Sequence, residues 1–196
     1  MVASAMAAVA KVPVWMSAAE FLVWEPGDGL MWQLVDGEPQ AMAPASRTHE
    51  VLQGQLAGLI WERLRGGPCS VVVAPGVIPR VQASHNVRVP NIAVVCGDYD
   101  IEQAALSDPV LLVEILSPSN EAETWANVWT YTTIPSIREI LVLRSATIGA
   151  DLLRRQADGS WPSEPERATE GDLVLESVGL RIPLVEVYAT TRLRVS

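Results

Sequence analysis

The segment from Val110 to Leu116 constrains the fold more than any other part of the sequence. Every residue in it is apolar except Glu114, and Ser117 and Pro118 follow directly. A continuous apolar run of this length, bounded by turn-forming residues, predicts a buried strand. We therefore expect it inside a sheet that helices cover, with one carboxylate in its interior.

Glu114 needs a partner in such a strand. Burial of an unpaired carboxylate costs several kcal/mol or raises its pKa until the group becomes neutral. The charge is expected to be paired, hydrogen-bonded or bound to a metal. An arginine on a neighbouring strand would make Glu114 purely structural, and the residues alone leave both alternatives open.

The remaining segments predict helices and strands around this strand. Capping-box spacing from Ser17 to Glu20 predicts a short helix that ends near residues 26–27, and Asp36-Gly37 predicts the turn of a hairpin formed by residues 30–35 and 39–42. Apolar residues at helical spacing predict a long helix after Ser46, ended by residues 66–68. Further strands are expected at residues 70–73, 76–81, 87–96 and 139–143, and a helix at 120–131.

The C-terminal part, with short apolar pieces at residues 148–153, 173–175 and 184–187, predicts antiparallel strands at an edge. Together the segments predict one domain over residues 1–196 with a core of about 46–143. Its class is α/β (α+β), with a central mixed β-sheet flanked by helices, an N-terminal helix and hairpin, and C-terminal antiparallel strands.

Composition excludes several classes of protein. A net charge of −9 argues against binding nucleic acid mainly through bulk electrostatics. No apolar run approaches the roughly 20 residues that span a bilayer, and residues 1–14 do not fit a signal peptide, so a cytoplasmic protein without membrane contact is expected. Cys69 and Cys96 are expected as two small buried side chains, not as a disulfide or a zinc site.

Four ordered pieces of the sequence together resemble the PD-(D/E)XK nuclease superfamily. Within it they are similar to the large bacterial family of putative restriction endonucleases, long known as a domain of unknown function. The pieces are Val35-Asp36-Gly37-Glu38 with residues 42–46 and His49, then residues 89–95, then residues 113–119, then Tyr131 with Ile134-Pro135-Ser136 and Arg138-Glu139-Ile140. The resemblance implies a restriction-endonuclease-like fold over most of the chain.

The resemblance also implies an activity and a site. It implies a hydrolase that cuts DNA with Mg²⁺, for which Mn²⁺ can substitute, where an aspartate and a glutamate hold the metal and a lysine assists. By position, Glu114 is the glutamate, Asn91 stands at the aspartate and Asn127 at the lysine, while Glu38 is a further acidic residue. Glu114, Asn91 and Glu38 are thus the expected metal ligands, and His49 is a secondary candidate for proton transfer.

Two asparagines at charged positions predict a partly degenerate active site. Substitute groups are available in the sequence, namely Glu121, Glu123, Arg47, Arg80 and Arg88. The alternative function is a catalytically inactive binding or regulatory module that forms a homodimer through the apolar N-terminal segment, the Trp125 and Trp129 pair and the edge strands. A third reading is an unrelated α/β domain.

Each candidate also has a simpler interpretation. Glu38 could be a solvated hairpin residue and His49 a capping or surface residue, while Asn91 could make local hydrogen bonds to the backbone.

Overall fold

The structure is a computed structural model of the 196-residue chain, and it describes residues 15–98 and 102–193. The apolar N-terminal segment lies outside these ranges. The expectations that it contributes to a dimer and that it is not a signal peptide both concern this segment. Within them, no helix combines the length and the apolar character that crossing a membrane requires.

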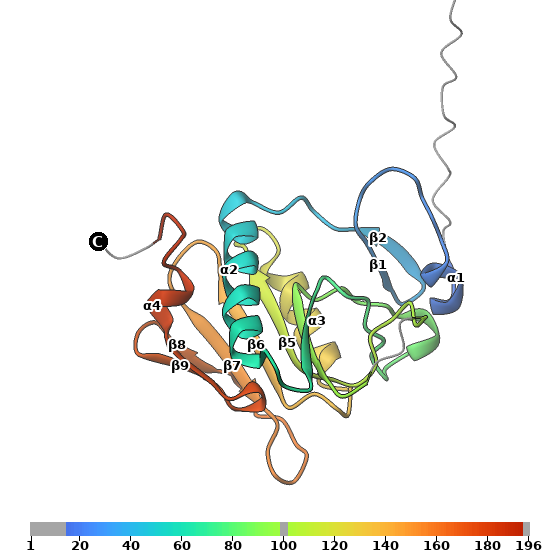
Figure 1. Ribbon diagram of the computed structural model, residues 1–196. Helices are drawn as coiled ribbons and strands as arrows, with labels where there is room; N and C mark the ends of the chain where they lie inside the picture. Colours follow the sequence, from blue (N-terminus) through green and yellow to red (C-terminus); the bar gives the residue numbers. More distant parts are fainter. Residues whose placement is uncertain (1–14, 99–101, 194–196) are drawn as a thin grey trace, which may run out of the picture.

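A six-stranded mixed sheet forms the centre of the molecule (Figure 1). Its strands, in spatial order, are β3 (Cys69–Val73), β4 (Ile92–Cys96), β5 (Pro109–Leu116), β6 (Glu139–Arg144), β7 (Ala150–Arg154) and β8 (Glu166–Ala168). β5 and β6 are parallel, and all other neighbours are antiparallel. The predicted mixed sheet with the Glu114 strand in its interior is therefore confirmed.

Helices cover both faces of this sheet. α2 (Arg47–Leu64) lies in front of it in Figure 1, and α3 (Glu121–Tyr131) lies behind it. Val113 and Ile115 of β5 join the core cluster that contains the buried residues of α2, whereas Leu112 and Leu116 join the cluster that contains Tyr131 of α3. Because side chains alternate along a strand, Glu114 belongs to the α3 face.

A small N-terminal unit precedes the sheet. α1 (Ala18–Leu22) has the predicted capping box, and the hairpin pairs β1 (Trp32–Val35) with β2 (Glu38–Ala41). Asp36 and Gly37 both have positive φ angles, 50° and 89°, as a tight hairpin turn of this kind requires. Gly37 has a second constraint, because a Cβ atom there would lie 2.2 Å from the indole nitrogen of Trp15.

Two expected strands are not formed as predicted. Residues 76–81 form no strand, and β4 begins only at Ile92, while Val77 and Arg88 make an isolated bridge. Pro79 and Pro90 interrupt these segments, because proline has no N–H to donate to a ladder. Asn91 therefore lies in a bend directly before β4 instead of inside a strand.

The C-terminal part also differs in one element. β9 (Asp172–Leu175) and β10 (Leu180–Pro183) form a separate antiparallel hairpin, joined by a 3-10 turn over Glu176–Val178. Residues 184–187, expected as a strand, form the one-turn helix α4 (Leu184–Val187). Pro183 ends β10 because it cannot extend the ladder, and the apolar residues after it pack onto the α2 face.

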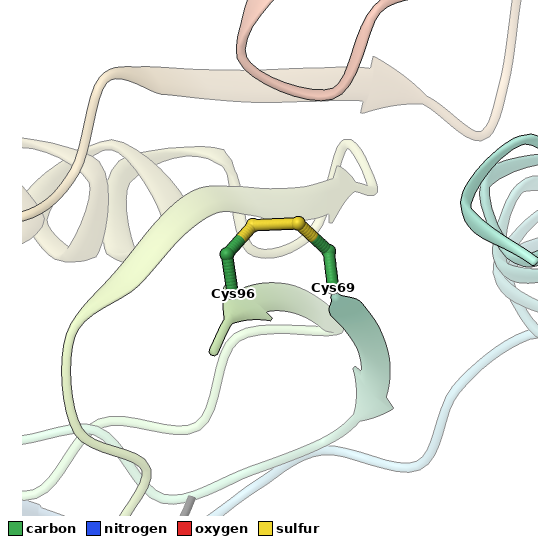
Figure 2. Close-up of a disulfide and its surroundings, with 2 residues drawn as sticks. All are labelled: Cys69 and Cys96. Atoms are coloured by element: carbon green, nitrogen blue, oxygen red, sulfur yellow. A yellow bond between two sulfur atoms is a disulfide. The ribbon is translucent and has the colours of Figure 1, made fainter. Parts of the chain in front are cut away.

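The two cysteines are bonded to each other, contrary to the expectation of free thiols (Figure 2). Cys69 is the first residue of β3 and Cys96 the last of β4, and the antiparallel register places them directly opposite each other. Sequence reasoning missed this disulfide because a separation of 27 residues carries no information about register.

Candidate functional site

A cavity of about 360 Å³ lies where β5 ends and α3 begins. Its walls come from the segments beside the hairpin, from the first half of α2, from residues 89–91, from β5 and from the first half of α3. Four of the five predicted site residues line it, and they are Glu114, Asn91, Asn127 and His49.

Glu114 lies at the inner end of this cavity with only 7% of its surface exposed. Tyr131 donates a hydrogen bond of 2.7 Å from its hydroxyl group to Oε1 of Glu114. Burial raises the pKa of Glu114 to about 8, and the nearby charge of Glu123 acts in the same direction, whereas hydrogen bonds from Tyr131 and from the backbone of Asn91 oppose the shift. Among the described residues no lysine or arginine forms an ion pair with Glu114.

Tyr131 is the partner that the sequence did not assign to Glu114. It is fully buried at the end of α3. Burial, together with the charge of Glu114, raises the pKa of Tyr131 well above its usual value, so its hydroxyl group stays protonated and donates. In the sequence, only the family resemblance, which includes Tyr131, pointed to this residue.

Asn91 is held by four other residues, one of which is Ala74, whose backbone N–H donates to the Asn91 carbonyl over 3.0 Å. Its Oδ1 accepts a hydrogen bond of 2.7 Å from the backbone N–H of Ile115, and its backbone oxygen accepts one of 2.9 Å from Nε2 of Gln53. Its Nδ2 lies 2.8 Å from Nε2 of His49. Burial lowers the pKa of His49, which favours the neutral ring, and the unprotonated Nε2 accepts from the amide. The side chain thus joins α2 to β5.

Asn127 is linked to the hairpin. Its Nδ2 donates to Oε1 of Gln33 over 3.3 Å, and Nε2 of Gln33 donates to Oε1 of Glu123 over 2.8 Å. Gln33 is buried on β1, so this chain of bonds fixes α3 against the hairpin. Sequence reasoning missed Gln33, because a single glutamine in a short strand carries no signal of its own.

Glu38 is not brought to this cavity. It is exposed on β2, where it pairs with Val35 across the hairpin, and it is absent from the lining residues. Glu123, named in the sequence only as a substitute, lines the cavity instead. The structure therefore supplies further carboxylates from α3 and, through Glu50, from α2, but not from β2.

The candidate cations also lie elsewhere. Arg47 and Arg80 are exposed, and Arg88 is buried close to Tyr131, Asp36 and Glu123 without lining the cavity. No lysine or arginine is among the lining residues within the described ranges. The cavity therefore carries negative and neutral groups only.

Apart from the ring nitrogens of His49, the potential metal ligands at the cavity are oxygen atoms. No group of three or more His, Cys, Asp and Glu side chains in the described part of the chain is arranged to hold a metal ion. Mg²⁺, however, takes one or two carboxylates and keeps several of its waters. Glu114, Glu123 and the second lone pair of Asn91 Oδ1 are ligands of the type that such a partly hydrated ion accepts.

A family model matches most of the chain, and a solved structure shares its fold. The model of the Uma2 family, described as "Putative restriction endonuclease", matches residues 18–184. An uncharacterized protein of Synechocystis sp. is 29% identical over 175 residues, which cover 88% of this chain and 91% of that protein. The crystal structure of a "putative nuclease" of DUF820 from Anabaena variabilis matches with a TM-score of 0.72 at 14% identity, over 89% of this chain and 98% of the other.

Proposed function

Because the chain belongs to the Uma2 family of putative restriction endonucleases, we propose that it hydrolyses DNA phosphodiester bonds with a divalent cation at the Glu114 cavity. The observation that supports this most is the convergence of Glu114, Glu123 and Asn91 on one cavity, which no lysine or arginine of the described residues lines. A phosphate is repelled from such a cavity unless a cation lies between them. A divalent ion is therefore the element that makes this site suitable for nucleic acid.

Mg²⁺, or Mn²⁺ in its place, would be held by Glu114 and Glu123 with the Asn91 oxygen. A bound ion would polarise the scissile phosphate and lower the pKa of a bound water. The chain's own residues position these ligands: Tyr131 orients the Glu114 carboxylate, and neutral His49 holds the Asn91 amide so that Oδ1 points at β5.

The two asparagines lower the rate in this proposal. Asn91 contributes no charge, so the ion is held less tightly than by a carboxylate. Asn127 contributes no positive charge near the transferring phosphate, and its amide already donates to Gln33. We expect measurable but slow cleavage by the natural protein.

A nuclease assay with restored charge tests the proposal. Asn91→Asp adds the missing carboxylate, so it should increase Mg²⁺-dependent cleavage of plasmid DNA by at least about tenfold, with a lower Mg²⁺ requirement. Glu114→Gln should abolish cleavage in both backgrounds. Asn120→Asp is the matched control, because Asn120 also lines the cavity but bonds to Ser117. Equal effects of the two Asn→Asp changes would contradict the assigned role of Asn91.

The second candidate is a catalytically inactive binding or regulatory module. It is favoured by the engagement of both polar atoms of the Asn91 amide with protein groups, and by a Glu114 side chain that tends to stay protonated. Calorimetric titration with Mg²⁺ and Mn²⁺ separates the two candidates. The absence of saturable binding by the natural chain, together with its appearance in Asn91→Asp, would support the inactive module.

A further inference from the structure

Part of the Glu114 cavity is apolar and comes from the two segments that flank the hairpin. Leu30 and Met31 precede β1 and are 51% and 50% exposed, while Met42 and Pro44 follow β2. The backbone N–H of Met42 donates to the carbonyl of Met31 over 2.8 Å, so the two segments run side by side. They form an apolar lip, which we define as Leu30, Met31, Met42 and Pro44.

The lip is fixed in place by local hydrogen bonds. Oδ1 of Asp28 accepts a bond of 2.9 Å from the backbone N–H of Leu30 and one of 3.2 Å from the indole of Trp32. The Trp32 ring in turn packs edge-on against Trp24 at 5.1 Å. Exposed apolar side chains held by such an arrangement can contact a ligand with little loss of conformational entropy.

The cavity also has many polar lining residues, and none of those in the described part of the chain is a lysine or arginine. Carboxamides come from Asn91, Asn120, Asn127 and Gln53, and carboxylates from Glu50, Glu114 and Glu123. The amide nitrogens of Asn91, Asn127 and Gln53 already bond within the protein, so it is the Oδ1 of Asn127 and the Oε1 of Gln53 that can accept from the N–H groups at the edge of a base. A ligand with an apolar face and a polar edge therefore suits the cavity better than a bare phosphate does.

The depth of Glu114 adds a constraint on the substrate. With 7% of its surface exposed, Glu114 can be reached only by a strand whose backbone enters the cavity together with the base attached to it. A volume of about 360 Å³ lies within the range of cavities that take small organic ligands. Paired bases present their stacked edges inside a duplex, so a base must be unpaired before it can enter.

From these observations we propose that the cavity takes one unpaired nucleobase of a single-stranded nucleic acid, seated against the apolar lip, with the strand's backbone next to Glu114. The inference rests on the proposed function and names its substrate class. Apolar contact between the lip and the flat face of a base supplies the binding that the missing cations do not.

Binding of three DNA probes to the full-length protein tests this inference. The probes are a 12-nucleotide strand with one 2-aminopurine, the same strand annealed to its complement, and an abasic strand of the same length that carries no bases. Affinity is measured in Mg²⁺ before cleavage products accumulate. We expect the single strand to bind at least about tenfold more tightly than the duplex or the abasic strand, with a change in 2-aminopurine fluorescence.

Two surface variants complete the test. Met31→Gln keeps the side-chain length but makes the lip polar, and it should weaken single-strand binding at least threefold. Val185→Thr, at an exposed apolar residue of α4 outside the lining, should leave binding unchanged.

The outcomes separate this inference from the proposed function. Cleavage of duplex at a rate equal to single strand, with equal affinities, would overturn the inference and leave the nuclease intact. Tight single-strand binding without cleavage of either probe would overturn the nuclease and support the inference. Failure of all three probes to bind would overturn the inference.

Discussion

Glu114 carries a carboxyl group whose proton is retained well above the pH at which an exposed glutamate loses it. Its pKa is raised from 4.5 to about 8, chiefly by burial. In this interval the folded state binds a proton that the unfolded state has released, so the free energy of unfolding falls as the pH rises. The stabilisation is fully present below about pH 4.5 and is lost by about pH 8.

Glu114→Gln should therefore flatten the pH dependence of stability. Glutamine stays neutral, so we expect the variant to unfold at a higher urea concentration than the natural protein at pH 8.5, with the difference shrinking or reversing at pH 5. Equilibrium urea unfolding at several pH values measures this. Glu38→Gln is the control, because that exposed residue should alter neither curve. Parallel curves for the natural chain and Glu114→Gln would contradict a raised pKa.

Individual site residues differ in how far the sequence could reveal them. Glu114 stood out because a charge in an apolar strand is conspicuous in any single sequence. Asn91, Asn127 and His49 came with the family resemblance, and they do line the same cavity. The role of Gln33 depends on how α3 packs against the hairpin, and the bond from Tyr131 to Glu114 depends on how α3 packs against β5. Neighbouring residues along the chain do not encode such packing.

At the level of elements, local signals predicted well where the helices begin. They predicted less well the strand limits and the end of α1, which stops at Leu22 and not near residues 26–27. The Ser17 and Ser46 caps and the Asp36-Gly37 turn fix backbone geometry within a few residues, and all three occur as expected. Residues 76–81 include residue types that favour strands, but only Val77 pairs with another segment, at Arg88. Whether such a segment forms a strand depends on pairing with a distant strand. The disulfide depends on the same kind of pairing, because the register of β3 and β4 places the two cysteines opposite each other.

The Cys69–Cys96 bond ties the edge strand β3 to β4 at one end of their pairing. Closing a loop with 27 residues of sequence separation restricts the unfolded chain and stabilises the fold by about 3 to 4 kcal/mol in the chain-entropy model. Cys69→Ser with Cys96→Ser should lower the free energy of unfolding by that order, measured with urea. The natural chain in excess dithiothreitol should behave alike.

Removal of the disulfide should not change the structure of the Glu114 cavity. Ser70 to Val73 of β3 still pair with β4, and Ala74 donates to the carbonyl of Asn91 over 3.0 Å at the opposite end. Mg²⁺ affinity should therefore be the same with and without the bond. A changed affinity would show that the disulfide helps to position Asn91. Disulfides are rare in the reducing cytosol, so this bond argues against the expected cytoplasmic location. That location stays a prediction.

For the whole molecule, charge and exposed aromatic residues bear on its partners. The homodimer stays a prediction. Trp61 of α2 and Trp129 of α3 are both exposed, but their helices cover opposite faces of the sheet. Trp125 is partly buried against the core on the α3 side, so Trp129, which is 40% exposed, is the more accessible ring of the expected pair.

Net charge makes a further prediction about nucleic-acid binding. A protein that neutralises 6 to 10 phosphates loses roughly a thousandfold or more in affinity between about 50 and 200 mM salt. This chain has a net charge of −9, and no cation lines the cavity in the described residues. At fixed Mg²⁺, raising NaCl over that range should weaken single-strand binding less than about tenfold. Fluorescence titration of the 2-aminopurine strand measures the slope. A steep slope would instead place the binding energy in surface arginines that contact the backbone, and base contacts at the lip would then be secondary.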